Sequence, residues 1–228
     1  MTYTNYNYAK FRSELYDLSN FPGPKVGESA LDFSATTLDG RPMHLSDLRG
    51  KVVVLETGSI TCPAYVHRIN PMNKLAKQYP DIVFLLLYVR EAHPGAQIGE
   101  HQTIEDKINR AQQLVTAEGE YRQVIIDNIN GSAHQAYGSL PNMIYVIGKY
   151  GTALFRADWN HAPIAAEVIA KASQSEDLQA ERALFRPVPP PVVLRVVSRA
   201  GFNAVLDLFI ALPRLLIQHA NKFKQHAT

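Results

Sequence analysis

The chain has 228 residues, of which 46% are hydrophobic and 19% charged, a balance that excludes wholesale disorder and collagen-like repeats and suffices for a packed core. The 23 Lys and Arg against 21 Asp and Glu leave a net charge of +2, so overall charge gives no reason to expect a nucleic-acid partner. The single cysteine, Cys62, excludes an intrachain disulfide and a cysteine-rich zinc or iron–sulfur site.

The sequence predicts neither a secretory signal nor a spanning helix. Residues 1–10 lack the basic and apolar regions of a secretory signal. The sequence also has no uninterrupted apolar run of about 18 residues, the length expected of a spanning helix. We therefore expect a cytoplasmic protein with a reduced thiol.

Composition divides the chain into three parts. We expect an N-terminal extension over 1–26, a catalytic domain over 27–186 and a C-terminal extension over 187–228. The boundary before the last part is the proline-rich run Pro187-Val188-Pro189-Pro190-Pro191, which favours stiff, extended backbone. The C-terminal part has five basic residues and one acidic residue, so its net charge is +4.

Apolar runs typical of buried strands alternate with helical patterns through the catalytic domain. The expected strands are 51–57, 82–89, 123–127, 143–147 and 152–157. The expected helices are 63–79, 103–117, 131–137, 162–173 and 176–186. This alternation predicts a mainly parallel α/β sheet with helices on both faces, and the turn at 148–151 adds an antiparallel hairpin.

Cys62 follows the first of these strands and precedes Pro63. Proline is favoured at the first position of a helix, so the sequence predicts Cys62 at the N-cap, where free N–H groups and the helix dipole favour a thiolate. A buried, inert cysteine is the alternative. Tyr65 stands where a dithiol motif would have its second cysteine, so an external thiol would have to resolve the oxidised sulfur.

A second cluster of polar residues follows the next strand. Glu91 and His93 lie directly after that strand, and His101 comes soon afterwards. Because neighbouring parallel strands end at the same edge of a sheet, we expect these side chains to face Cys62 and to act as general acid–base groups. The alternatives are a solvated surface loop and, more weakly, a His–His–Glu metal site, which nothing fixes geometrically.

These segments resemble the iodothyronine deiodinases. The resemblance rests on Gly58-Ser59-Ile60-Thr61-Cys62-Pro63, on Tyr88-Val89-Arg90-Glu91-Ala92-His93-Pro94, on His101 with Glu105-Asp106, and on Asp127 to Ile147. The stretch 27–54 is similar to the wider redoxin and peroxiredoxin group. The resemblance implies a thioredoxin-like fold and reductive removal of iodide from an iodinated phenol or tyrosine-like ring.

The resemblance also implies roles for particular residues. Cys62 falls where most animal members carry selenocysteine, while Glu91, His93 and His101 match the family's catalytic loop and second histidine. Ser59, Thr61 and Tyr88 match positions associated with proton relay or with hydrogen bonds to the reactive atom. Near the substrate, Met143 falls at the place of a substrate-holding arginine, and Pro141 looks like the cis-proline that lies beside the cysteine in thioredoxins. The resemblance implies no bound cofactor or metal; the partners are a small halogenated aromatic substrate and an external thiol reductant.

Two other functions fit parts of the sequence. A one-cysteine thiol peroxidase would use Ser59, three residues before Cys62, but it needs a proline where Leu55 stands. A non-catalytic thioredoxin-fold scaffold would keep the fold and bind partners through its C-terminal part.

The segment 192–217 is amphipathic with a wide apolar side. Gly201 and Pro213 predict that it bends or breaks into shorter helices. The apolar side can pack within the subunit, against a second copy or on a membrane surface attracted by the positive charge. The sequence favours a homodimer, with membrane-surface contact second.

Overall fold

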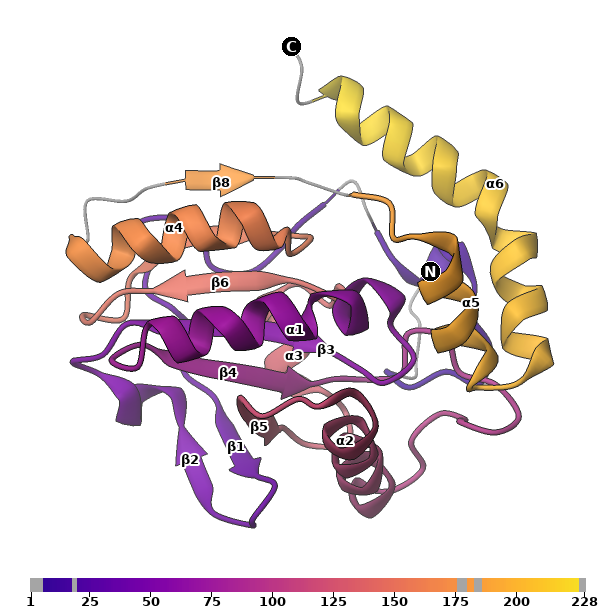
Figure 1. The fold of residues 1–228 in the computed structure, drawn as a ribbon, viewed down its shortest axis with the longest axis horizontal. Coiled ribbons are helices and arrows are strands. Elements are labelled where there is room, and N and C mark those ends of the chain that lie inside the picture. The colour runs from indigo at the N-terminus through magenta and orange to yellow at the C-terminus, as the bar shows by residue number, and fades with distance from the viewer. Residues whose placement is uncertain (1–5, 18–19, 176–179, 183–185, 226–228) are drawn as a thin grey trace.

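One mixed sheet organises the protein (Figure 1). The computed structural model describes residues 6–17, 20–175, 180–182 and 186–225. Within them the sheet has the strand order β2-β1-β5-β4-β3-β6-β7-β8. The strands are β1 (Ser34–Thr37), β2 (Pro42–His44), β3 (Val53–Gly58), β4 (Val83–Tyr88), β5 (Gln123–Ile126), β6 (Ile144–Ile147), β7 (Ala153–Ala157) and β8 (Ala180–Arg182).

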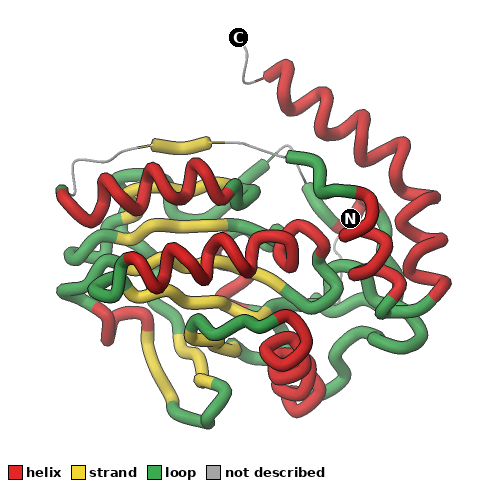
Figure 2. Tube along the Cα trace, in the orientation of Figure 1, coloured by secondary structure: helices red, strands yellow, loops and turns green. Residues whose placement is uncertain are grey.

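The helices lie on both faces of this sheet, as Figure 2 shows in colour. They are α1 (Pro63–Gln78), α2 (Ile104–Glu118), α3 (Ser132–Tyr137), α4 (Ala162–Gln174), α5 (Pro190–Ser198) and α6 (Phe202–Gln225), with short 3₁₀ turns η1 (Ser13–Leu15) and η2 (Leu45–Leu48). α2 begins at a capping box, because Thr103 accepts a hydrogen bond from the Asp106 N–H and Asp106 accepts one from the Thr103 N–H.

Apolar side chains on both faces of the central strands form the core. Val54 and Phe84 face one side, where they pack with Met72 of α1 and Ile169 of α4. The alternate residues Val53, Leu55, Leu85 and Leu87 face the other side, in a cluster that includes Tyr137 of α3 and two residues of the N-terminal extension. Strands covered on both sides need apolar residues at every position, which explains their near-continuous hydrophobic sequence.

The parallel pairing of β3 with β4 positions the site. Gly58 lies opposite Tyr88, so the loops that follow the two strands leave the same edge of the sheet. Gly58 is required there, because a Cβ atom at this residue would lie 2.3 Å from the ring of Tyr65. β5 runs parallel to β4, whereas β6 pairs antiparallel with β3 and with β7, which confirms the predicted hairpin.

The structure departs from the sequence-based elements in two places. The segment 176–186 was predicted to be helical, but its described residues 180–182 form β8, a strand parallel to β7; the rest of that segment, apart from Arg186, lies outside the described residues. Pairing with the free edge of β7 outweighs helical propensity, which is a weak preference. The sequence analysis also missed the hairpin of β1 and β2, whose strands of four and three residues are too short to show alternation.

The C-terminal extension breaks at Gly201, as predicted, where φ is +117°. α5 packs against the rest of the chain through Val196 and Val197, and α6 continues through Pro213. In Figure 1 α6 lies at the right-hand margin, and its C-terminal half extends away from the sheet.

Candidate active site

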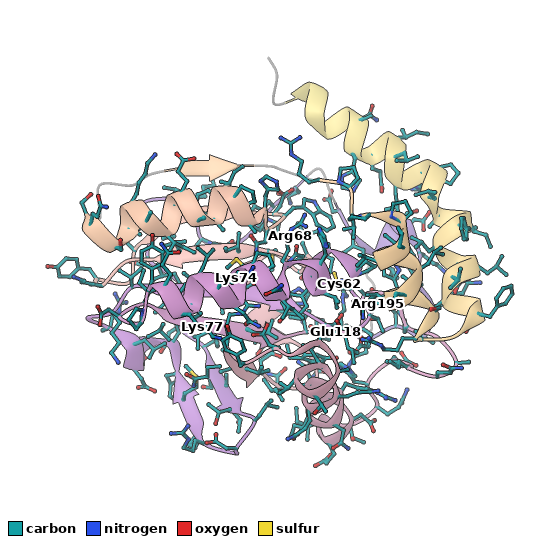
Figure 3. The ribbon with its side chains drawn as sticks, viewed as in Figure 1. Cys62, Arg68, Lys74, Lys77, Glu118 and Arg195 are labelled. Carbon is teal, nitrogen blue, oxygen red and sulfur yellow. The ribbon has the colours of Figure 1, made fainter. Side chains whose placement is uncertain are left out.

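Cys62 is the N-cap residue of α1, as the sequence predicted, and Pro63 takes the first helical position (Figure 3). Its side chain is 2% exposed. Burial raises the pKa of the thiol to about 12, against the weaker, opposite effect of the Tyr65 and Ala64 N–H groups at the helix N-terminus. The expected pull of the helix on the thiolate is therefore present, but burial outweighs it. The resting site holds a neutral thiol.

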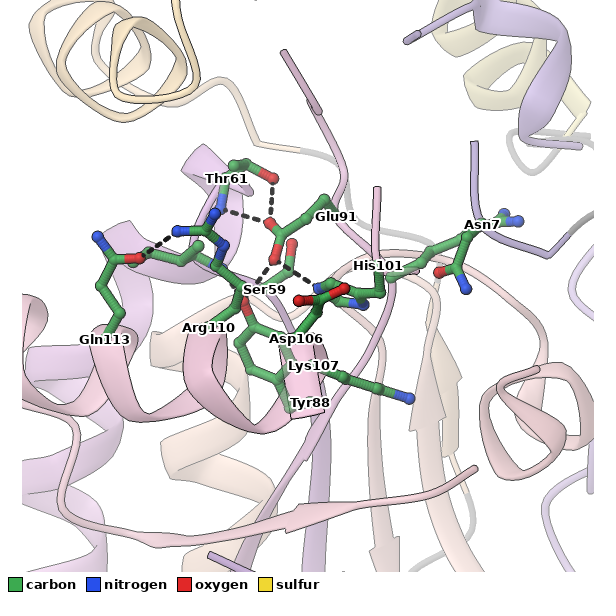
Figure 4. Close-up of polar contacts among 12 residues, drawn as sticks. Asn7, Ser59, Thr61, Tyr88, Glu91, His101, Asp106, Lys107, Arg110 and Gln113 are labelled. Carbon is green, nitrogen blue, oxygen red and sulfur yellow. Dashed lines mark hydrogen bonds and ion pairs between the residues drawn. The ribbon is translucent and has the colours of Figure 1, made fainter. Parts of the chain in front are cut away.

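Glu91 is the centre of a buried hydrogen-bond network (Figure 4). Its Oε2 accepts from the Thr61 hydroxyl at 2.5 Å and the Thr61 N–H at 3.2 Å. Its Oε1 accepts from the Tyr88 hydroxyl at 2.5 Å and lies 3.1 Å from Nε2 of His101. Burial alone would raise the pKa of Glu91, but the hydrogen bonds and charge interaction with His101, Thr61 and Tyr88 lower it, so the carboxylate is ionised.

The same network joins the two loops that leave the sheet edge. The Ser59 hydroxyl accepts from the Ala92 N–H at 3.2 Å, and the Thr61 hydroxyl accepts from the His93 N–H at 3.2 Å. The Ser59 and Thr61 hydroxyls, which were expected near the sulfur, thus bind the backbone of the loop that follows β4. The Tyr88 hydroxyl does the same for Ile60, whose N–H it accepts at 3.2 Å.

The ring of His93 is not part of this hydrogen-bond network. The ring lies against Phe11, with centroids 4.4 Å apart, and its Nδ1 is a buried atom without a hydrogen-bond partner among the described residues. Burial lowers the pKa of His93 to about 4, although the Glu91 carboxylate acts in the opposite direction. The imidazole is therefore neutral near pH 7. Glu91 positions this histidine through Thr61 and its backbone, whereas its direct side-chain contact is with His101.

Cys62 and His93 line one cavity of about 400 Å³. Aromatic rings of Phe11, Tyr16 and Trp159 lie around it, and α5 and α6 supply much of the remaining, mainly aliphatic, wall. Such a cavity fits a small aromatic molecule. Among the described residues no group of three or more His, Cys, Asp and Glu side chains is arranged to hold a metal ion.

The two residues expected beside a substrate are placed differently. Pro141 lines the cavity, but no cis peptide occurs among the described residues; the Leu140 carbonyl of the preceding peptide is held by the Thr57 hydroxyl at 3.1 Å and by the His134 ring at 2.8 Å. Met143 does not line the cavity. It is fully buried in the core, because it directly precedes β6 and its side chain packs on the face of the sheet away from α1.

Sequence reasoning missed the contribution of the N-terminal extension. Phe11 and Tyr16 line the cavity, and the guanidinium of Arg90 lies over the rings of Tyr6, Tyr8 and Tyr16 at 5.1 to 5.2 Å. These contacts hold the extension against the loop that carries Glu91 and His93. The signal was the tyrosine-rich composition of this extension.

The comparisons with known proteins agree with this geometry. A sequence profile described as iodothyronine deiodinase matches residues 5–165. The chain belongs to the iodothyronine deiodinase family. It is 33% identical over 114 residues to a thyroxine 5-deiodinase of Sparus aurata (45% of this chain, 42% of that protein) and 28% identical over 152 residues to a type I iodothyronine deiodinase of Xenopus laevis (60% of each). The chain thus spans about half the length of the curated relatives it matches.

Solved structures place the deiodinase match on a thioredoxin-like fold. A proposed protein disulfide isomerase from Bacteroides thetaiotaomicron superimposes with a TM-score of 0.55 at 18% identity, over 69% of this chain and 95% of that one. A proposed thiol:disulfide interchange protein DsbE from Chlorobium tepidum gives 0.52 at 18% identity, over 65% and 94%. The deiodinases are oxidoreductases, and the family match contains every residue of the polar network but ends before α5 and α6.

Proposed function

We propose that this protein removes iodide reductively from an iodinated aromatic ring, with Cys62 as the nucleophile. The observation that carries the proposal is the meeting of Cys62 and His93 in one aromatic-lined cavity, in a chain of the iodothyronine deiodinase family. A cavity of about 400 Å³ suits an iodinated phenol, whose ring is apolar and flat. The neutral thiol and neutral imidazole match a reaction that needs one proton delivered to carbon.

The reaction balances with the groups present and two external thiols. The Cys62 sulfur attacks the iodine atom, so that the S–I bond forms as the C–I bond breaks and the electron pair of the C–I bond stays on the ring carbon. In the same step the thiol proton is relayed through the neutral imidazole of His93 to that carbon. The ring is reduced and the sulfur is oxidised to a sulfenyl iodide.

An external thiol completes the cycle. It displaces iodide from the Cys62 sulfur to form a mixed disulfide, and a second thiol releases Cys62 and leaves as the oxidised disulfide. Because the chain has one cysteine, both of these thiols come from outside. Glu91, Thr61, Tyr88 and Ser59 act in this scheme as positioning residues, since they hold the two loops that carry Cys62 and His93. His101 helps to hold the Glu91 carboxylate through the contact between its Nε2 and Oε1 of Glu91.

Iodide release tests the proposal. Purified protein is incubated with iodotyrosines and with thyroxine in the presence of dithiothreitol, beside Cys62→Ala and Cys62→Ser. We expect release by the wild type and loss of release in both variants. Equal release by all three proteins would refute the proposal. A parallel assay with hydrogen peroxide covers the peroxidase alternative, which requires peroxide turnover without iodide release. A scaffold would show neither activity, whatever residue stands at position 62.

A further inference from the structure

The outward side of α6 is apolar. Six side chains, each at least half exposed, lie three, four or seven residues from one another along the helix, and therefore share one side of it. We call them the apolar stripe: Phe202, Leu206, Phe209, Ile210, Leu216 and Ile217. Monomeric soluble proteins seldom expose a contiguous apolar surface as long as this.

Three polar side chains of α6 lie away from the stripe and contact other parts of the chain. Asp207 is 6% exposed and forms an ion pair with Lys10 at 3.0 Å, and Arg214 pairs with Glu14. His219 lies against Trp159, with ring centroids 5.6 Å apart. The helix is therefore fixed with its apolar side outward, and the stripe needs a partner that comes from outside the chain.

The stripe is continuous with the cavity that contains Cys62. Phe209 and Leu216 belong to the stripe and also line the cavity, and Leu212 lies between them, lines the cavity and is 39% exposed. The cavity thus reaches the surface along the stripe. A second copy of the chain packed on the stripe would cover this opening, whereas a fluid lipid layer would cover the stripe and still admit an apolar substrate.

Composition and charge fit a lipid surface. An 18-residue window within Phe202–Asn221 has a mean hydropathy of 1.2, enough by length and composition for a helix that crosses a membrane. Crossing would pull Asp207 and Arg214 out of their ion pairs and into hydrocarbon, which is costly, so α6 fits a helix lying along the surface. The segment 187–228 carries a net charge of +4, and Lys222 and Lys224 follow the stripe in the sequence. This charge favours anionic headgroups.

We propose that the apolar stripe of α6 rests on an anionic lipid bilayer and that the Cys62 cavity opens toward the lipid. The second half deepens the proposed function and rests on it: the substrate would be an iodinated aromatic dissolved in the bilayer rather than in water. The stripe lies beyond the residues that match the deiodinase family, so the inference comes from this chain's own C-terminal extension.

Vesicle flotation tests the first half. The full chain is mixed with phosphatidylcholine vesicles that contain phosphatidylglycerol, beside the triple variant Phe202→Ser, Ile210→Ser, Ile217→Ser, whose three positions do not line the cavity. Tyr150→Ser is the matched control, because Tyr150 is 82% exposed, as Phe202 is, but lies in the turn between β6 and β7. We expect wild type and control to float, and the triple variant to bind roughly a thousandfold more weakly, since each of the three large apolar side chains is worth about tenfold when buried.

Several results would overturn this half. One is a wild type that does not float with the vesicles, and another is a triple variant that floats as the wild type does. A third is sedimentation, without vesicles, that shows a dimeric wild type and a monomeric triple variant. The last result would assign the stripe to a second copy. None of these measurements requires iodide release, so a protein that floats but releases no iodide would refute the proposed function and leave the lipid surface in place.

Labelling of Cys62 tests the opening. A long-chain alkyl maleimide dissolved in the vesicles should label wild-type Cys62 roughly a thousandfold faster than Cys62 of the triple variant, in proportion to the loss of vesicle binding. Water-soluble N-ethylmaleimide, without vesicles, should label both at one rate, which shows that the triple variant keeps its cavity. Equal labelling of both proteins by the lipid-dissolved reagent would mean that the cavity does not open to the lipid.

Discussion

On the side of Cys62 that faces the loop after β4, a buried hydrogen-bond network is centred on Glu91, whereas the side that faces α5 and α6 is mainly apolar. Glu91 alone accepts from Thr61 and Tyr88 and contacts His101. On the opposite side the cavity wall is mainly aliphatic, with Val193, Leu208 and Leu212 among its residues, and His219 is the polar side chain that α6 adds to it. The first arrangement fixes a catalytic geometry, and the second accepts an apolar ring through shape and burial.

The difference teaches how proton handling and binding are separated. His93 contacts both sides. Its backbone N–H donates to the Thr61 hydroxyl of the polar network, while its ring packs against Phe11 on the apolar side. Substitutions on the polar side should therefore change rate and stability together. Substitutions on the apolar side should change binding and the titration of His93.

The largest expected effect is on turnover in His93→Ala. Without the imidazole, neither the thiol proton nor the ring carbon has its transfer group, so we expect iodide release to fall about 10²–10⁴-fold. Alkylation of Cys62 by iodoacetamide should not change, because a neutral His93 forms no ion pair with the sulfur. An equal loss in alkylation would instead make His93 the group that activates the thiolate. His67→Ala, an exposed histidine of α1, is the control.

Glu91→Gln should have the next largest effect, on stability. The amide keeps one oxygen and replaces the other with an NH2 group. One of the two hydroxyls that donate to the carboxylate in the wild type, that of Thr61 or that of Tyr88, then faces a donor and loses its buried acceptor. We expect the free energy of unfolding to fall by about 3 kcal/mol, measured by urea denaturation. Glu105→Gln on the exposed side of α2 should be neutral.

The difference in the free energy of unfolding between wild type and Glu91→Gln should depend on pH in one direction. The pKa of Glu91 is lowered in the folded protein, so its stabilising contribution is complete above the unfolded-state pKa of about 4.3 and is lost as pH falls through the lower folded value. The gap between wild type and Glu91→Gln should therefore stay constant from about pH 5 upward and close in acid. A gap that widened in acid would contradict an ionised Glu91.

The sequence predicted those features of the site that neighbouring residues determine, and it did not predict those that depend on tertiary packing. Cys62 at the N-cap follows from Pro63 directly after it, and the shared edge of β3 and β4 follows from two adjacent buried strands. The Glu91–His101 contact was not predictable, because both were expected to face the sulfur and only tertiary packing turns them toward each other.

Contacts between residues far apart in the sequence could not be predicted for the same reason. Phe11 meets His93 across 82 positions, and no periodicity encodes that pairing. The wide apolar side of α6 was visible in the sequence, but its outward direction was not. That direction is set by Asp207 and Arg214, whose partners lie in the N-terminal extension.

The third prediction concerns the thiol on the apolar side. With its pKa raised to about 12 by burial, Cys62 should react with iodoacetamide about tenfold faster for each pH unit between roughly pH 7 and 10, without a plateau. A cysteine peptide under the same conditions should level off above its pKa of about 8.5. A plateau for Cys62 near neutral pH would show that the helix N-terminus outweighs burial after all.

The smallest expected effect is that of Phe11→Leu on His93. The Phe11 ring covers the imidazole, and burial is what lowers the pKa of His93 to about 4. Leucine keeps most of the apolar volume but covers the ring less fully, so water reaches the imidazole and its pKa should rise by about one unit, toward the ordinary value near 6.5. The shift is measured by following the ring protons of His93 by NMR against pH, with Phe33→Leu, which packs on Tyr137 instead, as the control. Because a depressed histidine pKa makes the folded state lose stability as pH falls from about 6.5 toward the folded value, the variant should also lose less stability than wild type over that interval. An unchanged pKa in Phe11→Leu would mean that the cavity walls other than Phe11 desolvate His93, and that the N-terminal extension serves the site only by holding the loop in place.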